Sequence, residues 1–288
     1  MEIRAVKHLG RFKDIIVTLF RYGFDDVVER LDLPGKVLLE KIHRVGVEMS
    51  TWERIRHILE DLGPTFIKFG QLMSLRPDLI PNPLILELRK LQDEVAPVPH
   101  DAVREMVEKS LRRPVADAFL AFEETALAAA SLAQVHRAVL RENGQPVAVK
   151  VQRPRIRQVI ETDLSIMEMV AQQLDERMEA VRIYDLPNLV REIKKGLLRE
   201  LDFSREARHM KIFQKNLAGE EGFYIPRLFD TFSTSQILTM ELVEGTKLKD
   251  LLPGASVDRE LLAKRGLRLT VKQILGDGFF HADMHPGN

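Results

Sequence analysis

The sequence predicts an α+β fold, with helices through residues 1–115 and an antiparallel sheet with further helices over residues 116–288. Two observations indicate this. Apolar residues recur every three or four positions in the N-terminal part, which is the spacing of one face of a helix. Later in the chain, two runs of alternating apolar residues flank Asn143-Gly144. This dipeptide is typical of a tight hairpin turn of type I′, which requires positive φ at both central positions.

The composition excludes several classes of function. The 288 residues are 45% apolar, enough for one large or two small domains. Lysine plus arginine and aspartate plus glutamate balance at 43 each, so nucleic acid is not an expected partner. The absence of cysteine excludes disulfides, thiolate catalysis and cysteine-based zinc sites. No apolar run is long enough for a membrane-spanning helix, and we expect no cleaved signal peptide.

The first helices are expected over residues 3–21 and 22–63, the second interrupted by a turn at Leu33-Pro34-Gly35. Residues 3–21 form an amphipathic pattern whose polar face is mainly basic. Such a helix can lie on an anionic membrane surface, or it can pack on its own domain with a solvated basic face. We favour packing, because most amphipathic helices in proteins face a core.

The next helix is expected to begin at Pro64, a residue suited to a first helical turn, and to end before Pro77. Lys68 and Gln71 lie three positions apart on one side of it, beside Gly70, which allows close approach of a neighbouring segment.

Further helices are expected over residues 84–94 and from Asp101 to Leu111, with Asp101 as the cap of the second. We place the boundary between the helical extension and the next domain at residue 115.

The hairpin around Asn143 places a lysine inside a β-strand. The stretch that begins at Ala126 opens with a run of small residues that we expect to be a loop before the first hairpin strand. In the second strand, Val147, Val149 and Val151 share one face while Ala148 and Lys150 share the other. Lys150 is therefore expected to point at whatever lies under the sheet. A nucleotide phosphate would suit it, although a solvated lysine on an ordinary hairpin is an equal alternative.

The rest of the chain continues the alternation of helices and strands. Long helices are expected over Ile156–Met178 and Asn188–Gln214, and strands over Ile225–Phe232 and Gln236–Val243. A final helix is expected over Leu261–Leu275, ended by the glycines that follow it.

In this order the elements resemble the small lobe of a protein kinase and, more narrowly, the UbiB family of atypical kinases, also called ADCK-type. The motifs that carry the resemblance are Lys68-Phe69-Gly70-Gln71 (K-x-G-Q), Ala128-Ala129-Ala130-Ser131 (the Ala-rich loop), Val147-Ala148-Val149-Lys150, Glu200-Leu201-Asp202 with Glu206-Ala207, and His281-Ala282-Asp283 with Asn288. The resemblance covers residues 25 to 288. One departure is Met284, where the family usually has proline.

The resemblance implies that the chain binds ATP or ADP with Mg²⁺. Lys150 would hold the α- and β-phosphates, oriented by an ion pair with Glu206, unless Glu206 is only a surface acid of its helix. Asp283 would be the catalytic-loop base and Asn288 a ligand of Mg²⁺, a cation that prefers oxygen ligands. Without the resemblance, these two residues read as an ordinary loop carboxylate and a turn-forming asparagine.

The resemblance also implies which residues surround the nucleotide. They are the loop residues Ala128, Ala129, Ala130 and Ser131, the strand residue Ala148, and the backbone carbonyl of Glu241 with the N–H of Val243 at the adenine. The alternative for Glu241 and Val243 is an ordinary strand end.

In this family the K-x-G-Q helix looks like a lid over the nucleotide, with Lys68 and Gln71 on it. Lys68 is implied to meet the pair Glu200 and Asp202. Residues two apart cannot share a helical face. We therefore expect Glu200 to face Lys68 and Asp202 to lie nearer the phosphates and metal. A fixed lid would keep a protein substrate away from the γ-phosphate.

Two functions stay open. The first is an ATP-dependent atypical kinase or ATPase that supports ubiquinone or related isoprenoid-quinone biosynthesis. Quinone-precursor lipids and quinone-biosynthesis proteins would be its partners, in the cytoplasm or on the cytoplasmic face of a membrane. The second is a nucleotide-responsive lipid-binding or scaffolding module. The resemblance implies an Asp-Phe-Gly metal-binding segment after Asn288 that this sequence lacks, so we expect a truncated large lobe and weak or absent catalysis by residues 1–288.

Overall fold

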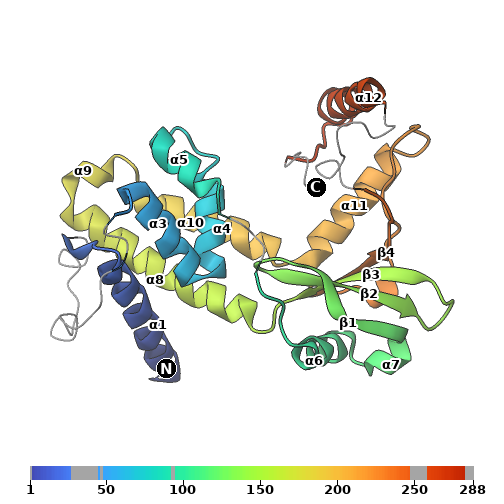
Figure 1. Cartoon of the computed structure of the whole chain (residues 1–288), viewed down its shortest axis with the longest axis horizontal. Coiled ribbons are helices and arrows are strands. Elements are labelled where there is room, and N and C mark those ends of the chain that lie inside the picture. The colour runs from blue at the N-terminus through green and yellow to red at the C-terminus, as the bar shows by residue number, and fades with distance from the viewer. Residues whose placement is uncertain (1, 27–44, 46–47, 92–94, 247–257, 283–288) are drawn as a thin grey trace.

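The computed structural model describes residues 2–26, 45, 48–91, 95–246 and 258–282 (Figure 1). It confirms the α+β class. The elements are, in chain order, α1 (Glu2–Arg21), α3 (Thr51–Leu62), α4 (Pro64–Met73), α5 (Asn82–Leu88), α6 (His100–Leu111), α7 (Val115–Ala118), β1 (Phe119–Ala129), β2 (Ala133–Leu140), β3 (Pro146–Gln152), α8 (Ile156–Arg177), α9 (Glu179–Arg182), α10 (Leu186–Glu200), α11 (Phe203–Asn216), the 3₁₀ turn η2 (Asp230–Phe232), β4 (Ile237–Glu241), α12 (Arg259–Val271) and the π-helical turn η4 (Lys272–Gly276).

The molecule has a helical side and a sheet side, joined by α8 and α10 (Figure 1). The sheet is antiparallel throughout and has the strand order β1-β2-β3-β4. Helices α6 and α7 cover one face, where Val103 and Val107 pack with Val147, Val149 and Val151 in one buried cluster. Helix α11 covers the other face through Phe203, which packs against β2 and β4. The alternation expected for β3 is therefore confirmed. The domain boundary at residue 115 stays a prediction.

The turn between β2 and β3 differs from the expected one. The hairpin is confirmed, but type I′ is wrong, because in this turn only Gly144, at φ 69°, has positive φ among the described residues. The Leu140 N–H donates to the Gln145 carbonyl at 2.9 Å, so the loop is longer than two residues. The Asn143 side-chain oxygen accepts from the Gln145 N–H at 3.0 Å. Asn143 thus stabilises the turn through its side chain rather than through a left-handed backbone.

Two strand predictions are wrong. The small-residue run expected to be a loop lies in β1 up to Ala129, where Ala128 pairs with Val135 and Ala129 with Gln134. Register shifts along β1 break its alternation, which removes the periodic signal of a strand. The strand expected over Ile225–Phe232 is a single bridge at Leu228 followed by η2.

Helix α1 packs on its own domain, as favoured above. Ile15 is buried in a cluster with Phe66 of α4 and Ile166 of α8, among others, and Ile16 packs beside it. The turn expected at residues 33–35 lies outside the described residues. Within the part of the chain that the structure describes, no helix is both long and apolar enough to cross a bilayer.

Several helix boundaries also differ. Asp101 lies inside the first turn of α6 and is not its cap, because the helix begins at His100 after Pro99. Helix α5 ends at Leu88, short of the expected end at residue 94. The single helix expected over Asn188–Gln214 is wrong.

The expected single helix is broken at Asp202, which separates α10 from α11. Its side chain accepts from the Ser204 N–H at 3.1 Å and from the Ser204 hydroxyl at 2.6 Å. Asp202 therefore caps α11. Such side chains compete with the backbone for the helix hydrogen bonds, so the apolar period continues while the helix restarts.

Gly70 has neighbouring side chains packed closely against it. A Cβ built on Gly70 of α4 would lie 2.4 Å from Leu91 Cδ1 and 2.8 Å from Leu59 Cδ1. Both leucines belong to a packed cluster, so Gly70→Ala should destabilise the protein by about 1–3 kcal/mol through overpacking. The matched control is Gly196→Ala in α10, where a Cβ meets nothing within 4 Å. That variant should gain up to about 1 kcal/mol from helix propensity. Urea unfolding of both variants checks this, and a similar effect at the two sites would contradict it.

His136 of β2 makes stability depend on pH. It is fully buried, its Nδ1–H donates to the Glu123 carbonyl at 2.8 Å, and its Nε2 accepts from the Gln134 amide at 2.7 Å. Burial lowers the pKa of His136 below its usual value, so the folded state holds the ring neutral. The contribution of the neutral ring to the free energy of unfolding is complete above the unfolded-state pKa of about 6.5. It is lost as the pH falls toward the lower pKa of the folded state.

We therefore expect the free energy of unfolding to fall between pH 7.5 and 5.5, measured by urea titration. His136→Gln should reduce this fall, because it removes the titrating ring and keeps an amide in its place. His281→Gln, at an exposed position, is the matched control and should keep the pH dependence of the parent chain. If the free energy of unfolding of His136→Gln fell with pH as much as that of the parent, His136 would not be the group responsible.

Candidate functional site

The centre of the candidate site is an ion pair between β3 and α11. Lys150 Nζ lies 2.9 Å and 2.7 Å from the two carboxylate oxygens of Glu206. The ammonium also lies 4.9 Å from the ring centroid of Phe203, the first residue of α11. The structure thus brings Lys150 and Glu206 together. Both side chains are half-buried, so the pair keeps one side accessible to a ligand.

The position of Glu206 depends on how α11 starts. The Asp202 cap fixes the first turn, and the Ser204 hydroxyl that it accepts from holds the pKa of Asp202 below its usual range. Just before the cap, the buried Gln152 amide donates to the Leu201 carbonyl and, at 3.2 Å, to the Ser235 carbonyl. Gln152 lies on β3, two residues beyond Lys150. One strand therefore carries the lysine and anchors the helix that presents its partner.

A second lysine–glutamate pair joins α4 to α10. Lys68 Nζ lies 3.3 Å from Glu200 Oε1, and the lysine side chain is mostly buried. The structure thus places Glu200 toward Lys68, as expected, while Asp202 belongs to the next helix. Gln71 uses its amide to donate to the Leu91 carbonyl at 3.2 Å. Its observed hydrogen bond therefore joins α4 to the segment that follows α5.

The turn between β1 and β2 is held by backbone and arginine contacts. Ala128 and Ala129 end β1, and the Ala130 N–H donates to the Ala133 carbonyl at 2.8 Å. Arg153 Nε donates to the Ala130 carbonyl at 2.7 Å, and Ser131 is fully buried. These contacts favour a stiff turn. The role of Arg153 was missed from the sequence, because its partner Ala130 lies 23 positions earlier and no local pattern indicates it.

The end of β4 carries the residues expected at the adenine. Glu241 accepts a hydrogen bond from the Tyr224 hydroxyl and another from the Arg227 N–H at 3.1 Å. The tyrosine hydroxyl is the main cause that holds the pKa of Glu241 below its usual range. Ala148 pairs across the sheet with Met240, and Val243 is exposed. The side chain of Glu241 and its N–H, which donates to the Arg227 carbonyl at 2.8 Å, are therefore both occupied by the fold.

The expected catalytic residues Asp283 and Asn288 lie outside the described residues. The segment before them is anchored on α11, where the Phe279 ring contacts His209 at 5.4 Å and Phe213 at 4.9 Å between ring centroids. Among the residues that the structure describes, no group of three or more potential metal ligands occurs. Asn288 therefore stays a prediction as a Mg²⁺ ligand.

Comparison with known proteins decides the family. Residues 90–288 match the model of the ABC1 atypical kinase-like domain. The chain belongs to this family. It is 38% identical to proteins named probable protein kinase UbiB from Vibrio parahaemolyticus and Photobacterium profundum, over 97% and 96% of this chain. The chain spans about half the length of these relatives, 53% and 52%.

A solved structure also resembles this chain. It is described as the complex of Rv3197 with erythromycin from Mycobacterium tuberculosis. The TM-score is 0.59 at 27% identity, covering 80% of this chain and 58% of that one. The resemblance to the UbiB family and the α+β kinase-like fold are thus confirmed. A kinase-like domain implies nucleotide binding, whereas the individual site residues stay predictions.

Proposed function

We propose that this chain is the ATP-binding part of an atypical kinase or ATPase. The observation that carries the proposal is the ion pair between Lys150 and Glu206 under the sheet. A lone ammonium there would lose hydration without compensation, so a carboxylate partner both stabilises and orients it. Two of its three N–H donors point to Glu206, which leaves one for the α- and β-phosphates of a nucleotide.

The remaining roles follow from the family resemblance. Asp283 would act as the base that orients the attacking group, and Asn288 would hold Mg²⁺, which when bound supplies neutralisation of phosphate charge. Ala128, Ala129, Ala130 and Ser131 would cover the phosphates, and the stiff turn that Ala130 and Ser131 form after β1 supports this. The backbone of Glu241 and Val243 would meet the adenine beside Ala148.

The contact of Lys68 with Glu200 supports the lid role of α4. It joins the K-x-G-Q helix to α10, and α10 leads directly into the helix that bears Glu206. A lid fixed in this way would exclude a protein chain from the γ-phosphate. We therefore propose ATP hydrolysis or action on a small molecule, in support of ubiquinone or related isoprenoid-quinone biosynthesis at a membrane surface. A quinone-precursor lipid and other quinone-biosynthesis proteins would be partners.

The deciding experiment measures Mg-ATP hydrolysis by a protein that extends beyond residue 288 through the complete large lobe. Asp283→Asn should abolish turnover, because it removes the base and keeps the side-chain volume. The control is Asp230→Asn, an exposed aspartate 2.8 Å from Lys211, which should leave the rate unchanged. Equal rates in Asp283→Asn and the parent, with nucleotide binding intact, would instead support a nucleotide-responsive lipid-binding or scaffolding module.

A further inference from the structure

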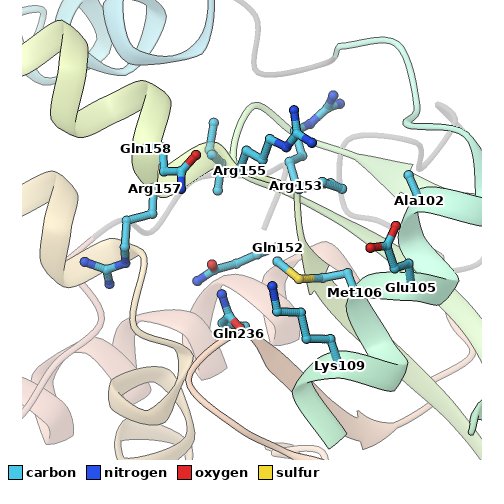
Figure 2. A pocket seen from close by; sticks show the side chains of 12 residues that line it. Ala102, Glu105, Met106, Lys109, Gln152, Arg153, Arg155, Arg157, Gln158 and Gln236 are labelled. Atoms are coloured by element: carbon cyan, nitrogen blue, oxygen red, sulfur yellow. The ribbon is translucent and has the colours of Figure 1, made fainter. Parts of the chain in front are cut away.

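A cavity of about 590 Å³ lies between α6 and the connection from β3 to α8. Figure 2 shows side chains from α6, from the end of β3, from the start of α8 and from the turn before β4 around it. Its walls share no residue with the proposed nucleotide site. The volume is within the range of about 300–1,000 Å³ that is common for small-molecule sites.

The walls of this cavity are strongly cationic. Lys109, Arg153, Arg155 and Arg157 line it, against the single carboxylate of Glu105. Arg153 is used by the fold, since it donates to the carbonyls of Ala130 and, at 2.8 Å, Ala96.

Two of these cations form no ion pair with any carboxylate in the described part of the chain. Arg157 is 3.5 Å from Glu161, outside the cavity walls. Within the described ranges, however, neither Lys109 nor Arg155 has a carboxylate at ion-pair distance. They come from α6 and from the β3–α8 connection, so they flank the cavity from two elements.

The other groups on the walls indicate the kind of anion. Gln158 and Gln236 bring amide groups that can donate to oxygen, while Met106 and Ile156 add apolar surface. A phosphate group carries up to two charges and three acceptor oxygens, which suits cations and amides arriving from several directions. The apolar surface and the volume leave space for an organic part of the ligand.

We propose that this cavity binds a phosphate-bearing small molecule, with Lys109 and Arg155 as its main charged contacts. The inference does not rest on the proposed nucleotide function. The cavity is nevertheless connected to that site through one side chain. The buried Gln152 lines the cavity and also donates to the Leu201 carbonyl, between Glu200 and Asp202.

The backbone of Arg155 offers a variant that should fold. Arg155 has φ 59°, in the left-handed region that favours glycine, so Arg155→Gly removes the guanidinium and relieves the backbone. The matched control is Arg112→Gly, because Arg112 has φ 55° at the end of α6 and does not line the cavity. Both variants lose one positive charge at a position suited to glycine. Lys109→Gln is a second test at an exposed side chain.

The experiment titrates the chain with three probes: inorganic phosphate, glycerol 3-phosphate, and phosphatidylglycerol–phosphatidylcholine vesicles. Isothermal calorimetry serves the two soluble probes and co-sedimentation serves the vesicles. We expect glycerol 3-phosphate to bind to the parent chain. Its affinity should be at least about tenfold lower for Arg155→Gly and Lys109→Gln, and unchanged for Arg112→Gly. Binding of vesicles alone, lost in Arg155→Gly and kept in Arg112→Gly, would support the site with a lipid headgroup as the source of the phosphate. No binding of any probe, or equal binding by the two glycine variants, would overturn the proposal.

Discussion

Replacing Arg11 with methionine is expected to lower the free energy of unfolding by about 3–5 kcal/mol. Arg11 of α1 donates from Nε and Nη2 to the two carboxylate oxygens of Asp163, at 2.7 Å and 3.1 Å. Asp163 is fully buried in the middle of α8 and also accepts from the Thr65 hydroxyl at 2.6 Å. Without Arg11, this carboxylate would stay buried with no cation to compensate it. Chemical denaturation at neutral pH measures the loss.

The matched control lies on the same helix. Arg21 pairs with Asp61 at 3.4 Å, but these side chains are 42% and 39% exposed, against 25% and 0% for Arg11 and Asp163. Arg21→Met should therefore cost less than about 1 kcal/mol. Adding Asp163→Asn to Arg11→Met should recover part of the loss, because the second change removes the stranded charge. Equal losses at Arg11 and Arg21 would show that the buried pair has no special role.

Replacing Lys150 with methionine is expected to weaken ATP binding by about 10- to 100-fold, the cost of losing a charge-assisted contact to phosphate. The change keeps the apolar stem and removes the ammonium, so the effect should concentrate on the phosphates. Adenosine, which has none, should bind equally to both proteins. Fluorescence titration with ATP, ADP and adenosine separates these contributions.

Lys194 provides a control of nearly the same geometry. Its Nζ lies 2.8 Å from Glu168 with both side chains 32% exposed, compared with 2.7 Å and exposures of 28% and 39% for Lys150 and Glu206. This pair joins α10 to α8 within the helical side of the molecule. Lys194→Met should match Lys150→Met in any stability cost and leave ATP affinity unchanged. A parallel loss of affinity in both variants would count against a phosphate role for Lys150.

Local patterns predicted the parts of the fold that depend on neighbouring residues. The alternation in β3 placed Lys150 opposite the buried valines, and proline at position 64 marked the start of α4. The motifs shared with the UbiB family then paired Lys150 with Glu206 and Lys68 with Glu200, and these contacts are present. Periodicity alone could not have chosen those partners, because each pair joins separate elements.

The features that were missed depend on contacts between distant segments or on irregular backbone. The register shifts in β1 remove the alternating pattern of a strand, so the sequence predicts a loop at its run of alanines. Asp202 restarts a helix without interrupting its apolar period. The bond between Arg11 and Asp163 spans 152 positions, so no local window contains both residues. Arg153 likewise reaches across the sheet to the Ala130 carbonyl.

The alternation along β3 also restricts how this lobe can change. Its valines fill the core on one face while Lys150 serves the other, so an insertion of one residue ahead of the lysine would exchange the two roles. Substitutions in this strand can therefore change the size of a side chain, whereas insertions and deletions are not tolerated. During folding, the hairpin must therefore reach its correct pairing before the lysine and its acidic partner can meet at all.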